Sequence, residues 1–137
     1  MPELNKGFAI SLDTTRHIVK VQAWGFWNEE LVKKYRKAFT EKIRELRANG
    51  NEWYALMDFR EFLPRSEEVQ RMMNDHIVSA QKEGMKKIGY LGERSMVQLR
   101  LNRVFRKEDM QMSAFFDSER EAIRWLMKDH PTKSRSP

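Results

Sequence analysis

The sequence contains no cysteine and only three histidines among its 137 residues. The lack of cysteine excludes disulfide bonds, thiolate metal sites and cysteine nucleophiles. His17, His76 and His130 lie too far apart in the chain to show the spacing of a histidine-built metal site. Gly-rich phosphate loops, nucleophile elbows and paired-histidine motifs are also absent. We therefore expect no enzyme, no metal and no cofactor.

Long apolar runs are missing too. No segment approaches the roughly 20 apolar residues that a membrane span needs, and residues 1–7 lack the basic-then-apolar pattern of a signal peptide. Glycine and proline number only six and four, and no internal repeat or low-complexity linker divides the chain. These absences predict a soluble, cytoplasmic protein with one domain at 8–127, an N-terminal extension at 1–7 and a flexible polar tail at 128–137.

The chain does contain enough apolar residues for a core, at 40% of the sequence. Alternating apolar residues predict strands, and apolar residues three and four apart predict helices. Asn28, Ser66 and Ser118 stand before helical segments, where their side chains can cap free backbone N–H groups. The resulting order, β-β-α-β-α-β-α-β-α, predicts an α/β fold with a mixed, mostly parallel sheet, an antiparallel hairpin at its start and helices packed on it. The expected strands are 8–12, 17–24, 53–59, 87–91 and 110–116, and the expected helices are 28–48, 66–83, 95–107 and 118–127.

The net charge of +6 is confined to one stretch. Residues 86–107 hold seven basic residues and one acidic residue, whereas the rest of the chain is neutral. Spacing on the expected helix places Arg100, Arg103 and Lys107 opposite its apolar face, which suits an acidic protein, a membrane surface or phosphates; the alternative is a solvated outer face. The motifs of nucleic-acid readers are absent, so we expect no nucleic-acid partner. The predicted basic patch consists of Arg94, Arg100, Arg103, Arg106 and Lys107.

Two aromatic residues near the end of the second strand have no assigned place in the core. If Trp24 and Phe26 are exposed, they form an apolar patch of the kind that binds a protein partner or a lipid chain. The region around them, or the edge of the hairpin, can also pair two copies of the chain, so a homodimer is an open alternative.

His76 falls within the apolar stripe of its helix. A histidine there is explained by burial with its hydrogen bonds satisfied. The functional alternative is a catalytic pair with Asp58, which requires the two elements to meet in space.

Several features together resemble a known family. These are the β-hairpin, Gly25 before the first helix, the strand that ends at Asp58, and the closing segment 116–126, which reads FDSEREAIRWL. Over 8–127 they resemble the STAS domain, and within it the SpoIIAA-like branch of small, free-standing bacterial proteins. The resemblance implies the SpoIIAA fold, and regulation or ligand binding in place of catalysis.

The best-known members of that family antagonise anti-sigma factors and are switched by phosphorylation of a serine. That serine lies in an Asp-Ser-Ser/Thr-Gly segment at the start of the helix after the third strand. Here Asp58 matches the aspartate, and Ser66 stands near the expected phosphorylation site without the glycine and the paired serines. Its alternative role is that of an N-cap. The recognition surface that the resemblance implies consists of Asp58, Phe62, Arg65, Ser66 and Glu67.

The resemblance therefore implies a regulatory module that binds a protein partner. Lipid-binding relatives of the Sec14 type share the fold. A small carrier or sensor for an apolar or lipid-like ligand, held near Trp24 and Phe26, is accordingly the alternative.

Overall fold

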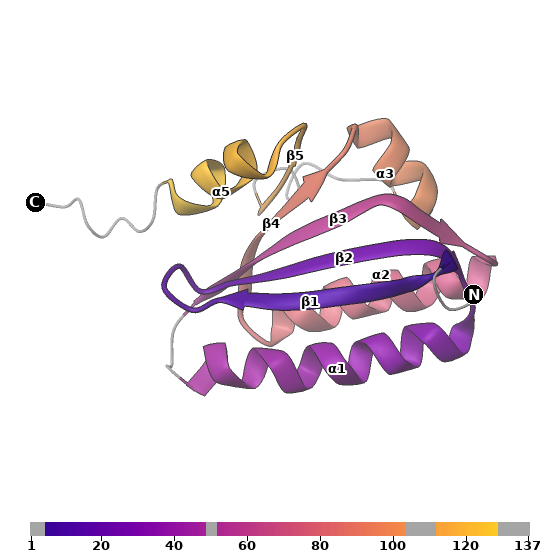
Figure 1. Cartoon of the computed structure of the whole chain (residues 1–137), viewed down its shortest axis with the longest axis horizontal. Coiled ribbons are helices and arrows are strands. Elements are labelled where there is room, and N and C mark those ends of the chain that lie inside the picture. The colour runs from indigo at the N-terminus through magenta and orange to yellow at the C-terminus, as the bar shows by residue number, and fades with distance from the viewer. Residues whose placement is uncertain (1–4, 49–51, 104–111, 129–137) are drawn as a thin grey trace, which may run out of the picture.

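The structure is a computed structural model of the chain, and it describes residues 5–48, 52–103 and 112–128. In this part of the chain five strands form one sheet, with α1 and α2 on one face and α5 on the other (Figure 1). The strands are β1 (Gly7–Asp13), β2 (Ile18–Trp27), β3 (Trp53–Pro64), β4 (Met85–Leu91) and β5 (Ser113–Phe116). The helices are α1 (Glu29–Ala48), α2 (Glu67–Lys82), α3 (Arg94–Leu101) and α5 (Glu119–Met127).

The strands lie in the order β1-β2-β3-β4-β5, so neighbours in the sheet are neighbours in sequence. β1 and β2 form an antiparallel hairpin, and the pairs β2–β3, β3–β4 and β4–β5 are parallel. Parallel neighbours need a crossover connection, which α1 and α2 supply on the same side of the sheet. The predicted α/β fold, with its initial hairpin and mostly parallel sheet, is confirmed.

The main core lies between the sheet and helices α1 and α2. Alternate residues of β2 and β3 face it, because successive side chains of a strand point to opposite faces. Trp27, Tyr35 and Phe62 are among its largest fully buried side chains. The ring of Trp27 meets those of Tyr35 and Phe62 edge-on, with centroids 5.5 and 5.4 Å apart. Each such ring contributes roughly 1.5–3 kcal/mol by its burial.

β3 is longer than the sequence predicts. The segment after residue 59, expected as a loop, continues the strand to Pro64. The register with β2 shifts on the way, since two steps along β2 are matched by three steps along β3, from Asp58 to Glu61. Such a bulge adds one residue to one strand and changes which side chains face the core.

Because of this shift, Phe59 and Phe62 are both buried, three residues apart in one strand. Phe62 is 0% exposed, and its ring packs against Trp27 and Phe59. The prediction that Phe62 belongs to an exposed recognition surface is therefore wrong.

α3 is shorter than predicted and begins differently. Ser95 lies inside its first turn, and the residue at the N-cap position is Glu93, without a side-chain capping bond. The helix ends at Asn102, whose φ of 51° is in the left-handed region, a conformation that commonly terminates helices. Arg103 therefore follows the helix and does not share a helical face with Arg100.

The second face of the sheet is only partly covered. α5 packs on β3 and β4 there, in a small cluster that contains Leu56, Leu91, Ala122 and Leu126. In the middle of β1 and β2, the residues that face away from the main core are polar or small: Ala9, Ser11, Lys20 and Gln22. This part of the sheet surface is open to solvent and is called the open face below.

Candidate functional site

The carboxyl ends of β2 and β3 and the starts of α1 and α2 lie together at one end of the sheet (Figure 1). Both helices have the predicted caps. The Asn28 side-chain oxygen accepts a hydrogen bond from the Leu31 N–H at 2.9 Å, and the Ser66 Oγ accepts one from the Val69 N–H at 3.2 Å. Each cap satisfies a free N–H group and stabilises the structure by about 1 kcal/mol. The N-cap role of Ser66 is confirmed.

The two helix starts are held together by the backbone. The Arg65 N–H donates to the Trp27 carbonyl oxygen at 2.9 Å, one residue before each cap. Between them lies a solvent-open hollow of about 520 Å³, lined by Asn28, Glu29, Glu30, Arg65, Ser66 and Val69.

Phe26 lies at the same end of the sheet. It pairs in register with Leu63, two residues before Arg65, and it lies two residues before Asn28. Its side chain is 58% exposed. Gly25 sets its position, because the φ of 85° there is left-handed and a Cβ atom would lie 1.8 Å from the Asn5 carbonyl oxygen.

Trp24 is placed differently from Phe26. It is half-buried, and its ring covers Gly7, where an added Cβ atom would lie 3.0 Å from the ring. The exposed apolar surface at this end is therefore centred on Phe26 alone. We call Phe26, Asn28, Arg65, Ser66 and Glu67 the carboxyl-end surface.

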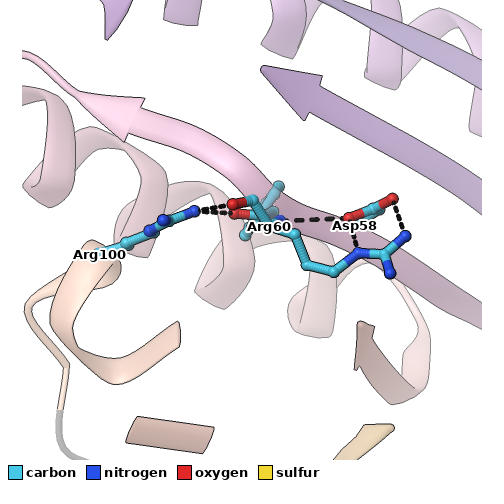
Figure 2. A network of polar contacts seen from close by, with 4 residues as sticks. Asp58, Arg60 and Arg100 are labelled. Atoms are coloured by element: carbon cyan, nitrogen blue, oxygen red, sulfur yellow. Dashed lines mark hydrogen bonds and ion pairs between the residues drawn. The ribbon is translucent and has the colours of Figure 1, made fainter. Parts of the chain in front are cut away.

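Asp58 points to the open face, away from the main core. Arg60 binds it with two side-chain hydrogen bonds, from Nε at 3.0 Å and from a terminal nitrogen at 2.9 Å (Figure 2). The Arg60 backbone N–H donates a third bond at 3.2 Å. Burial alone raises the pKa of Asp58, but the hydrogen bonds and the charge of Arg60 outweigh it and lower that pKa below its usual value. Asp58 is therefore a paired carboxylate.

Arg100 ties α3 to the bulge of β3. Its guanidinium donates to the Phe59 carbonyl oxygen at 3.0 Å and to the Arg60 carbonyl oxygen (Figure 2). The Asn74 amide of α2 donates to the Leu101 carbonyl oxygen at 2.7 Å and so holds the end of the same helix. Through its bonds, Arg100 holds α3 against β3, although its spacing predicts a place in a basic surface patch.

The two other described members of the predicted basic patch lie at opposite ends of α3. Arg94 is exposed at the start of α3, and Arg103 is half-buried beyond its end. Arg106 and Lys107 lie outside the described residues. The described part of the chain therefore does not present the predicted row of basic residues on one helix face.

A second hollow, of about 360 Å³, lies on the open face between the strands and the first turn of α5. Its polar rim includes Ser11, Lys20, Gln22 and the Asp58–Arg60 pair. The Lys20 ammonium lies 2.9 Å from a carboxylate oxygen of Glu119 and so links the hairpin to α5. Two ion pairs thus adjoin one hollow.

His76 and Asp58 do not meet. His76 is 4% exposed in the main core, where its Nε2 lies 2.7 Å from the Tyr35 hydroxyl. Burial, and after it the charge of Arg36, lowers the pKa of His76 to about 3, so the ring is neutral at pH 7. A neutral Nε2 can accept a hydrogen bond from the hydroxyl of Tyr35, which stays protonated because burial raises its pKa well above the usual value. The buried, satisfied histidine is confirmed.

Comparison with known proteins settles the type of fold. No protein-family model and no curated protein sequence matches the chain. A similar solved structure is that of an uncharacterized protein from the DUF3478 family with a SpoIIAA-like fold, from Shewanella loihica PV-4. It is 17% identical in sequence, the match covers 88% of this chain and 94% of that chain, and the TM-score is 0.65. The chain has a SpoIIAA-like fold.

This result confirms the resemblance at the level of the fold. In this SpoIIAA-like fold the structure brings Arg65, Ser66 and Glu67 together at the carboxyl-end surface, whereas Asp58 lies on the open face. Across the described ranges, no helix is long and apolar enough to cross a bilayer. The same ranges contain no cluster of three or more histidine, aspartate or glutamate residues arranged to hold a metal ion.

Sequence reasoning missed the polar contacts that position these residues. Arg60 follows Asp58 by two residues, the spacing that puts side chains on one face of a strand, so a longer predicted strand would have revealed the pair. The bonds of Arg100 to the backbone of β3 and the pairing of Lys20 with Glu119 join residues 40 or more positions apart. No local pattern reports such contacts.

Proposed function

We propose that this chain is a non-enzymatic regulatory module that binds a protein partner through its carboxyl-end surface. The observation that carries the proposal is the exposed Phe26 side chain at the end of the sheet where α1 and α2 begin. Protein interfaces are typically built around an apolar anchor with a polar rim. Asn28, Arg65 and Glu67 supply such a rim here.

The rigidity of this surface also supports the proposal. Both helix starts are capped, and the Arg65–Trp27 backbone bond joins them. A surface that is already ordered loses little conformational entropy when a partner binds.

The contacts of His76 and Asp58 support the absence of catalysis. The one catalytic pairing that the sequence suggested would join these residues, and they lie on opposite faces of the sheet with other partners. His76 is neutral and enclosed, and Asp58 is held by Arg60. His76 therefore lacks the access that a general acid or base needs, and Asp58 already has Arg60 as its partner.

The test is the mass of the protein after gentle purification from cells that naturally make it, first under native and then under denaturing conditions. We expect either the bare chain or a complex with another protein. Extra mass of a phosphate that survives denaturation and maps to Ser66 would show that Ser66 is phosphorylated. A small apolar molecule that is released on denaturation would contradict the proposal and identify a carrier.

A further inference from the structure

β1 forms one edge of the sheet, and no described strand pairs with its outer side. Alternate residues of an edge strand direct their backbone N–H and C=O groups outward, where another strand can bind them. Proteins usually protect such an edge with charged residues or proline. The first six residues of β1, Gly7–Leu12, contain neither. The opposite edge, β5, is only four residues long.

An apolar groove runs along the same edge. It has a volume of about 300 Å³ and lies between β1 and α1. Phe8, Ile10 and Leu12 are half-buried on the side of β1 that faces the main core. Their exposed parts are apolar surface that a second layer of protein can cover. The groove is lined by Phe8, Ile10, Ala38, Glu41 and Lys42.

The flank of α1 beside this groove carries charges of both signs. Lys34, Ala38, Glu41 and Glu45 follow one another at spacings of four, three and four residues, which places them on one side of a helix. Lys34 and Glu45 are exposed, and neither forms an ion pair with another described residue. Lys34 lies toward one end of the row and Glu45 toward the other.

We propose that this edge binds a second copy of the chain, with the two β1 strands paired antiparallel around Ile10. This two-fold arrangement places Ile10 against Ile10, and Phe8 against Leu12 of the other copy, all on the side of the helices. It joins the two sheets into one, and each copy satisfies the outer backbone groups of the other.

The charges on α1 favour a second copy over another partner. α1 runs in the same direction as β1 (Figure 1), and Ile10 lies beside Ala38 and Glu41 in the groove. A two-fold axis through Ile10 therefore passes α1 close to its residue 39 or 40. It brings Lys34 of each copy opposite Glu45 of the other, since these residues are about equally far from the axis. The row of charges is thus complementary to itself.

Sedimentation equilibrium of the full chain tests this proposal. We expect a dimer that Lys34→Glu weakens by about tenfold and Glu45→Lys weakens to a similar extent, because each turns two attractions into repulsions. The double variant, Lys34→Glu with Glu45→Lys, should restore the affinity. These residues are exposed on a helix, so the variants should fold, which circular dichroism checks.

Lys33→Glu is the matched control. It makes the same charge change one residue away, on another side of α1, and should leave the affinity unchanged. A chain that stays monomeric at about 100 µM overturns the proposal. A dimer that responds equally to Lys33→Glu and Lys34→Glu, or that the double variant does not restore, also overturns it. None of these results bears on the carboxyl-end surface, which uses other residues.

Discussion

The polar side chains on the two faces of the sheet differ in burial and in charge. On the face covered by α1 and α2, His76 and Tyr35 are enclosed, neutral and bonded to each other. On the open face, Asp58 is charged and pairs with Arg60 at the edge of a hollow that is open to solvent. The covered face therefore depends on apolar burial, and the open face on ion pairs that water already screens.

This difference predicts which side chains can be substituted without loss of the fold. Substitutions on the covered face remove buried contacts and should be costly. Substitutions on the open face and at the carboxyl-end surface should cost little stability. Those regions are therefore free to carry binding function.

The largest difference in stability is expected between variants of two phenylalanines, one on β3 and one on β2. Phe62→Ala removes a fully buried ring and should lower the free energy of unfolding by about 3–5 kcal/mol. Phe26→Ala removes a ring that is 58% exposed and should change it by less than about 0.5 kcal/mol. Urea unfolding measures both. Equal losses would show that Phe26 and Phe62 do not differ in burial.

The next effect is the acid sensitivity of the covered face. The pKa of His76 falls from 6.5 to about 3 on folding. Between these values the unfolded chain holds more protons, so lowering the pH destabilises the fold. From pH 7 to pH 5 this histidine should cost about 2 kcal/mol.

Unfolding free energies at both pH values, for the native chain and for His76→Gln, isolate this effect. The variant should be less stable at pH 7 and should lose about 2 kcal/mol less on acidification. An equal loss in the native chain and in the variant would mean that folding does not lower the pKa of His76.

The smallest effect concerns the open face. Arg60→Gln should change stability by less than about 1 kcal/mol, because the Arg60 side chain is 48% exposed. The pKa of Asp58 should nevertheless rise, since burial is then opposed by the backbone N–H bond of residue 60 but no longer by the side-chain bonds and charge of Arg60. The Asp58 carboxylate should then stabilise the fold less at pH values above its pKa.

An NMR titration of the Asp58 carboxyl group, in the native chain and in Arg60→Gln, measures this change. The control is Arg71→Gln, which removes an exposed arginine from α2. A pKa of Asp58 that does not depend on Arg60 would show that the pair does not form in solution.

The elements that depend on neighbouring residues could be predicted from the sequence. The caps at Asn28, Ser66 and Ser118 are examples, since each side chain bonds an N–H only three residues ahead. The alternating and helical apolar patterns also established the order of strands and helices, and so the α/β fold.

Contacts between distant elements could not be predicted. The bulge that buries Phe62 depends on the register of β3 against β2. The contact of Arg100 depends on carbonyl oxygens of β3 that are about 40 residues away. Spacing within one segment contains no information on either contact, so these two site predictions failed.

Photocrosslinking inside the native cells tests the proposed function most directly. A photoreactive residue is placed at Phe26, on the carboxyl-end surface, and in a second sample at Val78, an exposed apolar residue of α2. Val78 lies eleven residues beyond the start of α2, about 16 Å along its axis. We predict that position 26 captures a defined protein that position 78 does not. Capture of no protein at position 26, or of the same proteins at both positions, would contradict the proposal.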